Sequence, residues 1–244
     1  MKNTLLVLGA TSDIARAVAH RYASEGWDIL LAGRKTEILF RDAADLRIRY
    51  GVNAEGVSFQ ALDLASHQTF WSQFKEKPDG VLYAIGYLGD QIPNQSDWAE
   101  SKTVLETNFT AAVSILNIIA EDFEARRSGF IIGISSVAGD RGRMSNYIYG
   151  SAKAGFTSYL SGLRNRLSKK GVQVMTVKPG FVATKMTEGK PLPPLLTASP
   201  KQVANDIFKA YRSHKPVVYS RWYWKFIMLV IVHLPERLFM KLSL

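Results

Sequence analysis

The sequence predicts one α/β domain built on a doubly wound parallel sheet, with a hydrophobic helical extension at its C-terminus. Two observations lead to this prediction. Short, continuous apolar runs alternate with longer segments of helical periodicity, as expected of parallel strands that are buried on both faces. The chain has 244 residues, 47% of them hydrophobic, which is enough for one large core, and no repeat or linker divides it.

Strands and helices are expected in alternation along the chain. The predicted strands are residues 4–8, 27–32, 57–62, 80–85, 130–134, 172–177 and 217–219. The first predicted helix ends near residue 23, and four more cover residues 36–50, 68–75, 101–126 and 147–169. A further helix begins at the capped start Ser199-Pro200-Lys201-Gln202. We assign residues 1–184 to a cofactor-binding and catalytic core, and residues 185–244 to a substrate lid and extension.

Composition narrows the class of protein. The chain has no cysteine, which excludes disulfide and thiolate chemistry and favours a reducing, cytoplasmic compartment. Its four histidines stand in unrelated surroundings, so we expect no metal site. The N-terminus lacks the pattern of a secretory signal. The formal net charge of +10 suits anionic ligands or surfaces without choosing among them.

The first strand runs into a turn of small residues and then into a helix. The turn reads Gly9-Ala10-Thr11-Ser12-Asp13-Ile14-Ala15. This is the Rossmann-type arrangement that binds a dinucleotide pyrophosphate, because backbone N–H groups and the helix dipole point at the phosphates. The candidate cofactor contacts in this turn are Gly9, Thr11, Ser12, Asp13 and Ile14.

The residues that follow the next strands indicate which dinucleotide is bound. Arg34 stands where an acidic residue would bind the ribose 2′-hydroxyl of NAD. A basic residue there favours a 2′-phosphate, so we expect NADP(H) rather than NAD(H). Asp63, next to Leu64, could accept a hydrogen bond from the adenine amine. Gly86 follows the fourth strand at the same edge of the sheet.

A Ser, a Tyr and a Lys near the fifth strand suggest proton transfer. Tyr149 and Lys153 are four residues apart, so on a helix they share one face. A nearby ammonium would favour the phenolate and lower the pKa of Tyr149, making it a usable acid and base. Ser136 could hydrogen-bond a substrate oxygen beside the phenol. Taken alone, such a Tyr–Lys pair is more often structural.

Taken together, these motifs resemble the short-chain dehydrogenase/reductase family over nearly the whole chain. Asn108, Ser136, Tyr149 and Lys153 match the catalytic four of that family. The matching cofactor contacts are Gly9 in the turn, Asp63 at the adenine, and Pro179, Gly180, Val182 and Thr184 at the nicotinamide end.

The resemblance implies an NADP-dependent oxidoreductase. A carbonyl would accept hydride from NADPH and a proton from Tyr149, while Ser136 holds the oxygen. Lys153 would bind the nicotinamide ribose, and Asn108 would hold a water that returns the proton. A catalytically inactive NADP-binding regulator of the same fold is the alternative.

The sequence departs from the family pattern in two places. Asp13 and Ala15 replace the second and third glycines of the turn. An Asp so close to a pyrophosphate would repel it unless the side chain turns away, and we expect it to do so by capping its own helix. After the fourth strand, Tyr83-Ala84-Ile85-Gly86 retains only the glycine of Asn-Asn-Ala-Gly.

The C-terminal segment indicates a membrane-associated substrate. Residues 185–198 are rich in Pro and Gly, as in a mobile lid, although they could be a simple connection. Residues 221–225 read Arg-Trp-Tyr-Trp-Lys, which suits a membrane–water boundary. The apolar run 226–234 is too short to span a bilayer. We expect residues 221–242 to contact the inner face of a membrane peripherally, or else to complete the core or an oligomer interface, and expect no nucleic acid partner.

The substrate and the assembly follow from further resemblance. The tail and residues 87–90 are similar to one branch of the family, the decaprenylphosphoryl-2-keto-pentose reductases, which reduce a sugar ketone carried on a polyprenyl phosphate. A lipid-linked carbonyl is therefore one expected substrate, and a small soluble hydrophobic ketone is the other. The helices carrying Asn108 and Tyr149 form the usual dimer surface of the family. We expect a homodimer or homotetramer, with Ala111, Ala112 and Gly155 permitting close packing.

Overall fold

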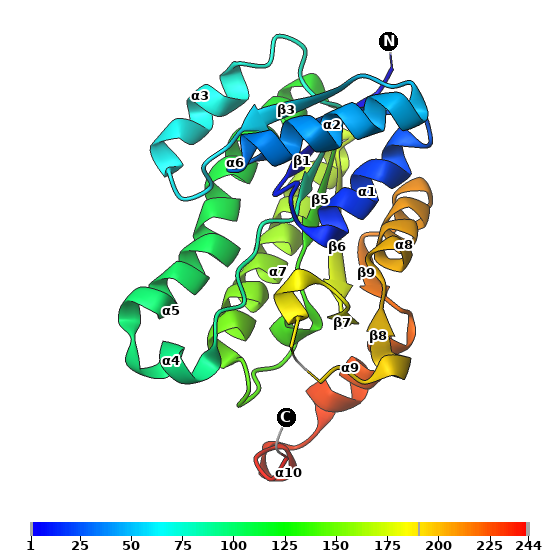
Figure 1. Ribbon diagram of the computed structural model, residues 1–244. Helices are drawn as coiled ribbons and strands as arrows, with labels where there is room; N and C mark the ends of the chain where they lie inside the picture. The colour runs from blue at the N-terminus through cyan, green and yellow to red at the C-terminus, as the bar shows by residue number, and fades with distance from the viewer. Residues whose placement is uncertain (1, 190, 243–244) are drawn as a thin grey trace.

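The protein is built on a parallel sheet with helices on both faces (Figure 1). The structure, a computed structural model, describes residues 2–189 and 191–242. Seven strands lie in the order β3-β2-β1-β4-β5-β6-β9, all parallel. They are β1 (Thr4–Leu8), β2 (Asp28–Gly33), β3 (Ala54–Ser58), β4 (Gly80–Tyr83), β5 (Phe130–Ile134), β6 (Gln173–Pro179) and β9 (Val217–Ser220). This is the predicted Rossmann-type doubly wound sheet.

Helices cover the sheet in two layers. The α-helices are α1 (Asp13–Ala23), α2 (Thr36–Tyr50), α3 (His67–Ser72), α4 (Gln91–Ser96), α5 (Trp98–Leu105), α6 (Ala111–Arg126), α7 (Tyr147–Leu167), α8 (Pro200–Arg212), α9 (Tyr223–His233) and α10 (Glu236–Phe239). One core cluster joins α1, α2 and α8 to the sheet, and a second joins α3, α6 and α7 to it. The two clusters lie on opposite faces, because successive side chains of a strand point to opposite sides.

The central strand β1 shows how the sequence produces this arrangement. Leu5 and Val7 belong to the cluster with α1 and α8, whereas Leu6 and Leu8 belong to the cluster with α6 and α7. All four side chains are fully buried, and each contributes about 1.5–3 kcal/mol of hydrophobic stabilisation. The strands are thereby fixed with their carboxyl ends along one edge, where a ligand crevice forms in doubly wound sheets.

The predicted strands agree with the structure to within two residues, apart from the third. We predicted residues 57–62, but β3 is Ala54–Ser58. This strand is at the edge of the sheet, where it pairs only with β2, in the register Ala32 to Val57. Because one side is open, β3 carries the exposed Glu55 and has no continuous apolar run. The buried Phe59, just past the strand, shifted the prediction.

The predicted helix 101–126 is interrupted. After α5, residues Glu106–Thr110 form a π-helical turn, η2, and α6 begins only at Ala111. A π turn widens the helix by one residue and is frequent at functional sites. Asn108 lies within it. By length and composition the stretch Trp98–Arg126 could cross a membrane, but Ile115 and Leu116 are fully buried in the core of the domain.

Two of the three small residues that we expected at a subunit interface lie elsewhere. Ala111 and Ala112 are fully buried inside the chain itself, so they pack their own domain, and our reason for placing them at a dimer surface was wrong. Gly155 is partly exposed on α7. The dimer or tetramer stays a prediction.

The C-terminal part of the chain adds a helix and a strand to the domain and then extends beyond the sheet. Helix α8 begins with the predicted capping box, in which Ser199 Oγ accepts from Gln202 N and Gln202 Oε1 accepts from Ser199 N. Strand β9 then joins the sheet beside β6. Helices α9 and α10 lie beyond the strands, at the same end of the molecule as α4 (Figure 1). Lys190 in the predicted lid, and residues 243 and 244 of the extension, lie outside the described residues.

Candidate active site

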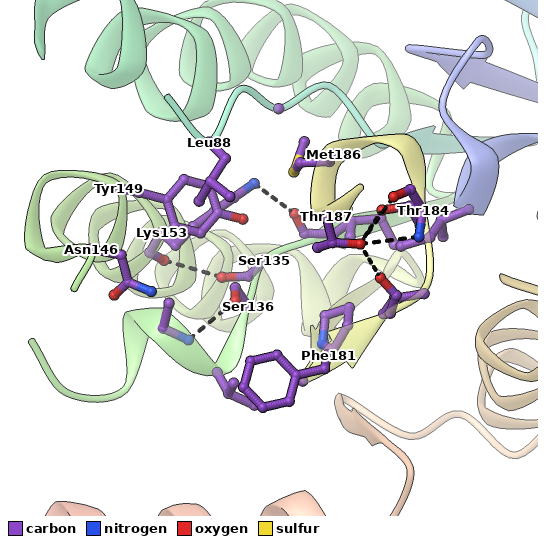
Figure 2. A pocket seen from close by; sticks show the side chains of 18 of the residues that line it. Leu88, Ser135, Ser136, Asn146, Tyr149, Lys153, Phe181, Thr184, Met186 and Thr187 are labelled. Carbon is purple, nitrogen blue, oxygen red and sulfur yellow. Dashed lines mark hydrogen bonds between the residues drawn. The ribbon is translucent and has the colours of Figure 1, made fainter. Parts of the chain in front are cut away.

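A cavity of about 430 Å³ opens at the carboxyl ends of β4, β5 and β6. Figure 2 shows Ser136, Tyr149 and Lys153 facing Thr184, Met186 and Thr187 across it. Ten of the predicted site residues line the cavity: Ser12, Ile14, Gly86, Ser136, Tyr149, Lys153, Pro179, Gly180, Val182 and Thr184. Segments that are far apart in the sequence are thus brought together, as predicted.

Tyr149 and Ser136 form the centre of the cavity. Tyr149 lies on the first turn of α7, and Ser136 follows β5, with its Oγ accepting a hydrogen bond from Ala138 N at 3.1 Å. Desolvation in the cleft raises the pKa of Tyr149 to about 12, and a hydrogen bond with Ser136 opposes part of that rise. The phenol is therefore fully protonated at neutral pH and can donate its proton.

Lys153 lies one helical turn further along α7 and is 3% exposed. Its Nζ is 3.1 Å from the Ile134 carbonyl oxygen and 5.6 Å from the centre of the Tyr149 ring. Burial lowers the pKa of Lys153 to about 7. The pKa of the phenol is therefore raised and not lowered as we expected, because desolvation disfavours the charged forms of both groups.

Asn108 is fully buried behind this centre and uses its amide on the backbone. Its Nδ2 donates to Tyr87 O at 2.6 Å and to Val104 O at 2.8 Å, and its Oδ1 accepts from Tyr87 N at 3.2 Å. Both amide hydrogens are occupied, so the side chain cannot donate to a water as well. Its evident role is to hold the segment after β4, next to Gly86, in place.

The glycine turn has the geometry of an anion site. Gly9 has φ of +85°, and a Cβ built on it would lie 2.8 Å from Ile85 Cγ1, so only glycine fits. Ser12 caps α1 by accepting from Ala15 N at 3.5 Å. The first N–H groups of α1 have no helical acceptor and can bind phosphate oxygens. Thr11 is partly exposed in the same turn.

Asp13 behaves differently from the expectation. Ser12 and not Asp13 caps the helix. Asp13 Oδ2 accepts a hydrogen bond from Lys185 N at 2.8 Å, across 172 residues of sequence. The carboxylate therefore holds the start of the lid segment against the glycine turn.

Six predicted cofactor residues do not line the cavity: Gly9, Thr11 and Asp13 in the turn, and Arg34, Asp63 and Leu64 further along the chain. The last three are exposed, after β2 and after the segment that follows β3. Their side chains form no hydrogen bond or ion pair within the described ranges, so Arg34 and Asp63 are available to a ligand at this edge. No group of three or more metal-ligating side chains occurs among the described residues.

Sequence reasoning missed the other side of the cavity. We call this side the loop wall, and it consists of Leu88, Gln91, Val137, Arg143 and Asn146. The opposite side, which we call the glycine-turn wall, consists of Ser12, Ile14, Gly180, Val182 and Thr184. Apart from Leu88, which lies in the stretch 87–90, the loop-wall residues belong to no motif that the sequence analysis used. The one available signal was the basic, glycine-containing stretch 139–146 directly before the Tyr149 helix.

Helix α9 supports the loop wall from behind, so the tail is only partly a surface feature. Trp224 and Met228 are buried and pack with Val137. A Cβ built on Gly180 would lie 1.9 Å from Trp224 Cε2, so this glycine admits the indole ring. Trp224 Nε1 donates to Leu196 O at 3.2 Å. The placement of Trp224 at a membrane boundary was therefore wrong, since it completes the core.

The outward side of the tail is apolar. Trp222, Phe226, Leu229 and Val230 are between 56% and 73% exposed, and they follow one another at helical spacing. Trp222 and Phe226 contact each other, with their ring centroids 5.8 Å apart. Helix α9 therefore has one face in the core and one exposed apolar face.

A doubly wound sheet with a Ser, a Tyr and a Lys gathered at its carboxyl edge has the construction of a carbonyl–alcohol oxidoreductase. Residues 3–192 match the family model described as short chain dehydrogenase. The protein belongs to the short-chain dehydrogenase family and is an oxidoreductase.

Relatives and solved structures agree with this assignment. The chain is 35% identical to an uncharacterized oxidoreductase of Mycobacterium tuberculosis over 89% of its length and 88% of the relative. It is 30% identical to a serine 3-dehydrogenase of Rhizobium radiobacter, over 77% and 75% of the two chains. The fold matches a short-chain dehydrogenase from Sphingobium yanoikuyae in complex with NADPH, with a TM-score of 0.82, 23% identity and 93% of both chains covered.

Proposed function

We propose that this oxidoreductase uses NADP(H) to reduce a ketone of a sugar carried on a lipid phosphate, at the inner face of a membrane. One observation carries the proposal. The cavity that holds Ser136, Tyr149 and Lys153 has a wall supported by a helix with an exposed apolar outer face. A soluble ketone needs no such face, whereas a lipid-linked substrate has to leave a membrane to reach the cavity.

The residues of the cavity have complementary roles in the proposed reaction. NADPH, when bound, supplies the hydride that reduces the carbonyl carbon. Tyr149 transfers its phenolic proton to the carbonyl oxygen as the π bond between carbon and oxygen breaks, and Ser136 donates a hydrogen bond to the same oxygen. Lys153 Nζ binds the ribose hydroxyls and stabilises the phenolate that forms. Asn108 positions the Gly86–Tyr87 backbone beside these groups.

The glycine-turn side fits a dinucleotide with a 2′-phosphate. Gly9 allows the close approach of the turn, and the N-terminal N–H groups of α1 suit the pyrophosphate. Val182, Thr184, Pro179 and Gly180 line the cavity, in the part where we place the nicotinamide. Arg34 is exposed at the end of β2 and supplies the charge for a 2′-phosphate, while Asp63 and Leu64 lie toward the adenine. NAD(H) lacks that phosphate and gains nothing from Arg34.

The tail has the charge and shape of a peripheral membrane contact. Its exposed apolar side chains continue beyond α9 to Leu238 in α10 and to Met240 just after α10, which are 53% and 71% exposed. From Lys201 onward there are eight basic and two acidic residues. Apolar groups that enter the interface and cations that attract anionic lipid act together in such contacts. The apolar helix Tyr223–His233 is too short to span a bilayer.

Vesicle co-sedimentation tests the membrane part of the proposal. We expect the wild-type protein to sediment with vesicles containing anionic lipid. The triple variant Trp222→Ser, Phe226→Ser, Leu229→Ser should remain in solution, because it removes the outer face and leaves Trp224 in the core. A control with Ile48→Ser, an 85% exposed apolar residue on α2, should sediment like the wild type. Equal sedimentation of the triple variant and the control would contradict the proposal.

A further inference from the structure

An arginine in the loop wall, Arg143, makes only weak contacts with the described residues. Arg143 Nη2 lies 3.4 Å from the Val137 carbonyl oxygen and 3.4 Å from Met228 Sδ, and both are weak contacts. Its Nε is buried and has no hydrogen-bond partner among the described residues. Arg143 is half-buried, and its guanidinium stays charged in the protein. An anion in the cavity would give it the strong hydrogen bonds that it lacks.

Arg143 differs from the neighbouring basic side chains, which have strong hydrogen-bond partners. Arg141, two residues earlier, donates to Ile231 O at 2.6 Å, to Leu234 O at 2.7 Å and to Glu236 Oε2 at 2.7 Å. The nearby carboxylate of Asp140 is already occupied by Lys178 Nζ at 2.5 Å and by the Tyr219 hydroxyl at 2.8 Å. Arg143 alone in this group is directed to the cavity without an ion pair in the described structure.

Two further polar groups of the same wall have unpaired atoms. Gln91 Oε1 accepts from Ile148 N at 3.3 Å, which turns its Nε2 away from that backbone, and this Nε2 is buried without a partner. Asn146, which Figure 2 shows on the Tyr149 side of the cavity, has a buried Oδ1 without a partner. Buried polar groups are nearly always hydrogen-bonded in folded proteins. Such atoms occur elsewhere among the described residues too, but three of them belong to side chains that line this one cavity, where a ligand with several polar atoms could pair with them.

We propose that Arg143 and Gln91 bind the phosphate group of the carbonyl substrate, an inference that rests on the proposed function above. The guanidinium of Arg143 gives charge-assisted hydrogen bonds to the phosphate oxygens, and Gln91 Nε2 adds a neutral donor from another element. Asn146 contacts the sugar between the phosphate and Tyr149.

The order of groups along the cavity agrees with such a substrate. The ketone lies at Tyr149 and Ser136, and the phosphate lies at Arg143, which contacts Met228 of α9. Helix α9 carries the exposed apolar face, so the lipid chain beyond the phosphate passes toward that face. In this arrangement the ketone contacts the proton donor, the phosphate contacts a cation, and the lipid chain contacts apolar side chains.

Binding of small prenyl ligands tests the phosphate site without requiring turnover. Isothermal titration calorimetry would compare geranyl phosphate, geraniol and geranic acid on protein saturated with NADP⁺, so that the cofactor's own phosphate contacts are occupied. We expect geranyl phosphate to bind roughly 10- to 100-fold more tightly than geraniol. The preference should be lost in Arg143→Gln and largely kept in Arg143→Lys. Gln91→Leu should weaken it by a smaller factor, about threefold to tenfold.

Two controls make the outcomes decisive. Arg49→Gln removes one positive charge from an exposed ion pair on α2 and should bind like the wild type. Unchanged NADP⁺ affinity shows that each variant is folded.

An Arg143→Gln variant that keeps the preference for geranyl phosphate, or a wild type with no such preference, would overturn the phosphate site. Tighter binding of geranic acid than of geranyl phosphate would assign the site to a carboxylate and overturn it too. A phosphate preference in a protein that reduces no ketone would keep the site and remove the proposed function.

Discussion

The two walls of the cavity differ in how they are built. The glycine-turn wall is made of backbone and small or β-branched side chains, held at the ends of β1 and β6 by the central sheet. The loop wall combines the apolar Leu88 and Val137 with Gln91, Arg143 and Asn146, and each of these three polar side chains carries a buried atom without a partner among the described residues. The first wall therefore offers backbone groups to a ligand, whereas the second offers side chains. A site of this kind keeps its chemistry on rigid elements and its selectivity on the segments between them.

The largest expected effect is on the chemistry between the walls. Tyr149→Phe removes the proton donor and leaves the ring, so kcat should fall by about 10²- to 10⁴-fold. NADPH affinity, measured by fluorescence titration, should stay within a few-fold of the wild type, because the glycine-turn wall is untouched. Loss of NADPH binding in a folded variant would mean that Tyr149 belongs to the cofactor contacts and that the two walls are not separate.

Gly180, which packs against Trp224, tests whether α9 is part of the domain. In Gly180→Ala the new Cβ would meet the Trp224 ring at 1.9 Å, so Trp224 or β6 has to move. We expect a loss of about 2–4 kcal/mol in the free energy of unfolding, measured with urea. Gly162→Ala on the exposed face of α7 meets nothing within 4 Å, and should be neutral or stabilising by up to ~1 kcal/mol. Equal stability of the two variants would show that α9 packs loosely.

The sequence predicted the glycine-turn wall far better than the loop wall. Gly9, Ser12 and Thr184 lie in short-range patterns, in which the strand, the turn and the helix N-terminus together determine the position of the backbone. Arg143 and Gln91 come from segments without periodicity, and their proximity depends on how α4 and α9 pack. The π turn at Asn108 was equally unpredictable, since it interrupts an otherwise continuous helical pattern.

The tail shows the same limit within a single helix. Its apolar and aromatic character was evident, but the side of the helix that enters the core depends on Gly180, which lies 44 residues before Trp224 and leaves room for its ring. Asp13 is a third case, because its partner Lys185 N is 172 residues away. Local patterns predicted the elements, and long-range contacts decided what the side chains do.

The burial of Lys153 predicts how the stability of the protein depends on pH. Burial lowers its pKa from the ordinary 10.5 to about 7, so between these pH values the unfolded chain binds more protons than the folded one. The free energy of unfolding therefore rises with pH across this window. Without added cofactor, the wild type should gain about 2–3 kcal/mol relative to Lys153→Met between pH 7 and pH 9.5. A constant difference between the two proteins would show that Lys153 keeps its ordinary pKa.

A smaller effect is expected at the outer end of the glycine-turn wall. Arg34→Asp removes a partner of the 2′-phosphate and adds a repelling charge, so the Kd for NADPH should rise at least ~10-fold more than that for NADH. The same change at Arg49, far along α2, serves as the control. A wild-type protein that binds NADH tenfold more tightly than NADPH would contradict this account of cofactor choice.

The most direct test of the lipid-linked substrate compares two ketones in one assay. NADPH oxidation would be followed with a ketopentose linked to a prenyl phosphate in anionic vesicles, and with the same ketopentose free in solution. We predict that kcat/KM is roughly 100-fold higher for the linked sugar, since the phosphate and the chain add binding that the free sugar lacks. Equal values for the two ketones, or no oxidation of NADPH with either, would contradict the account.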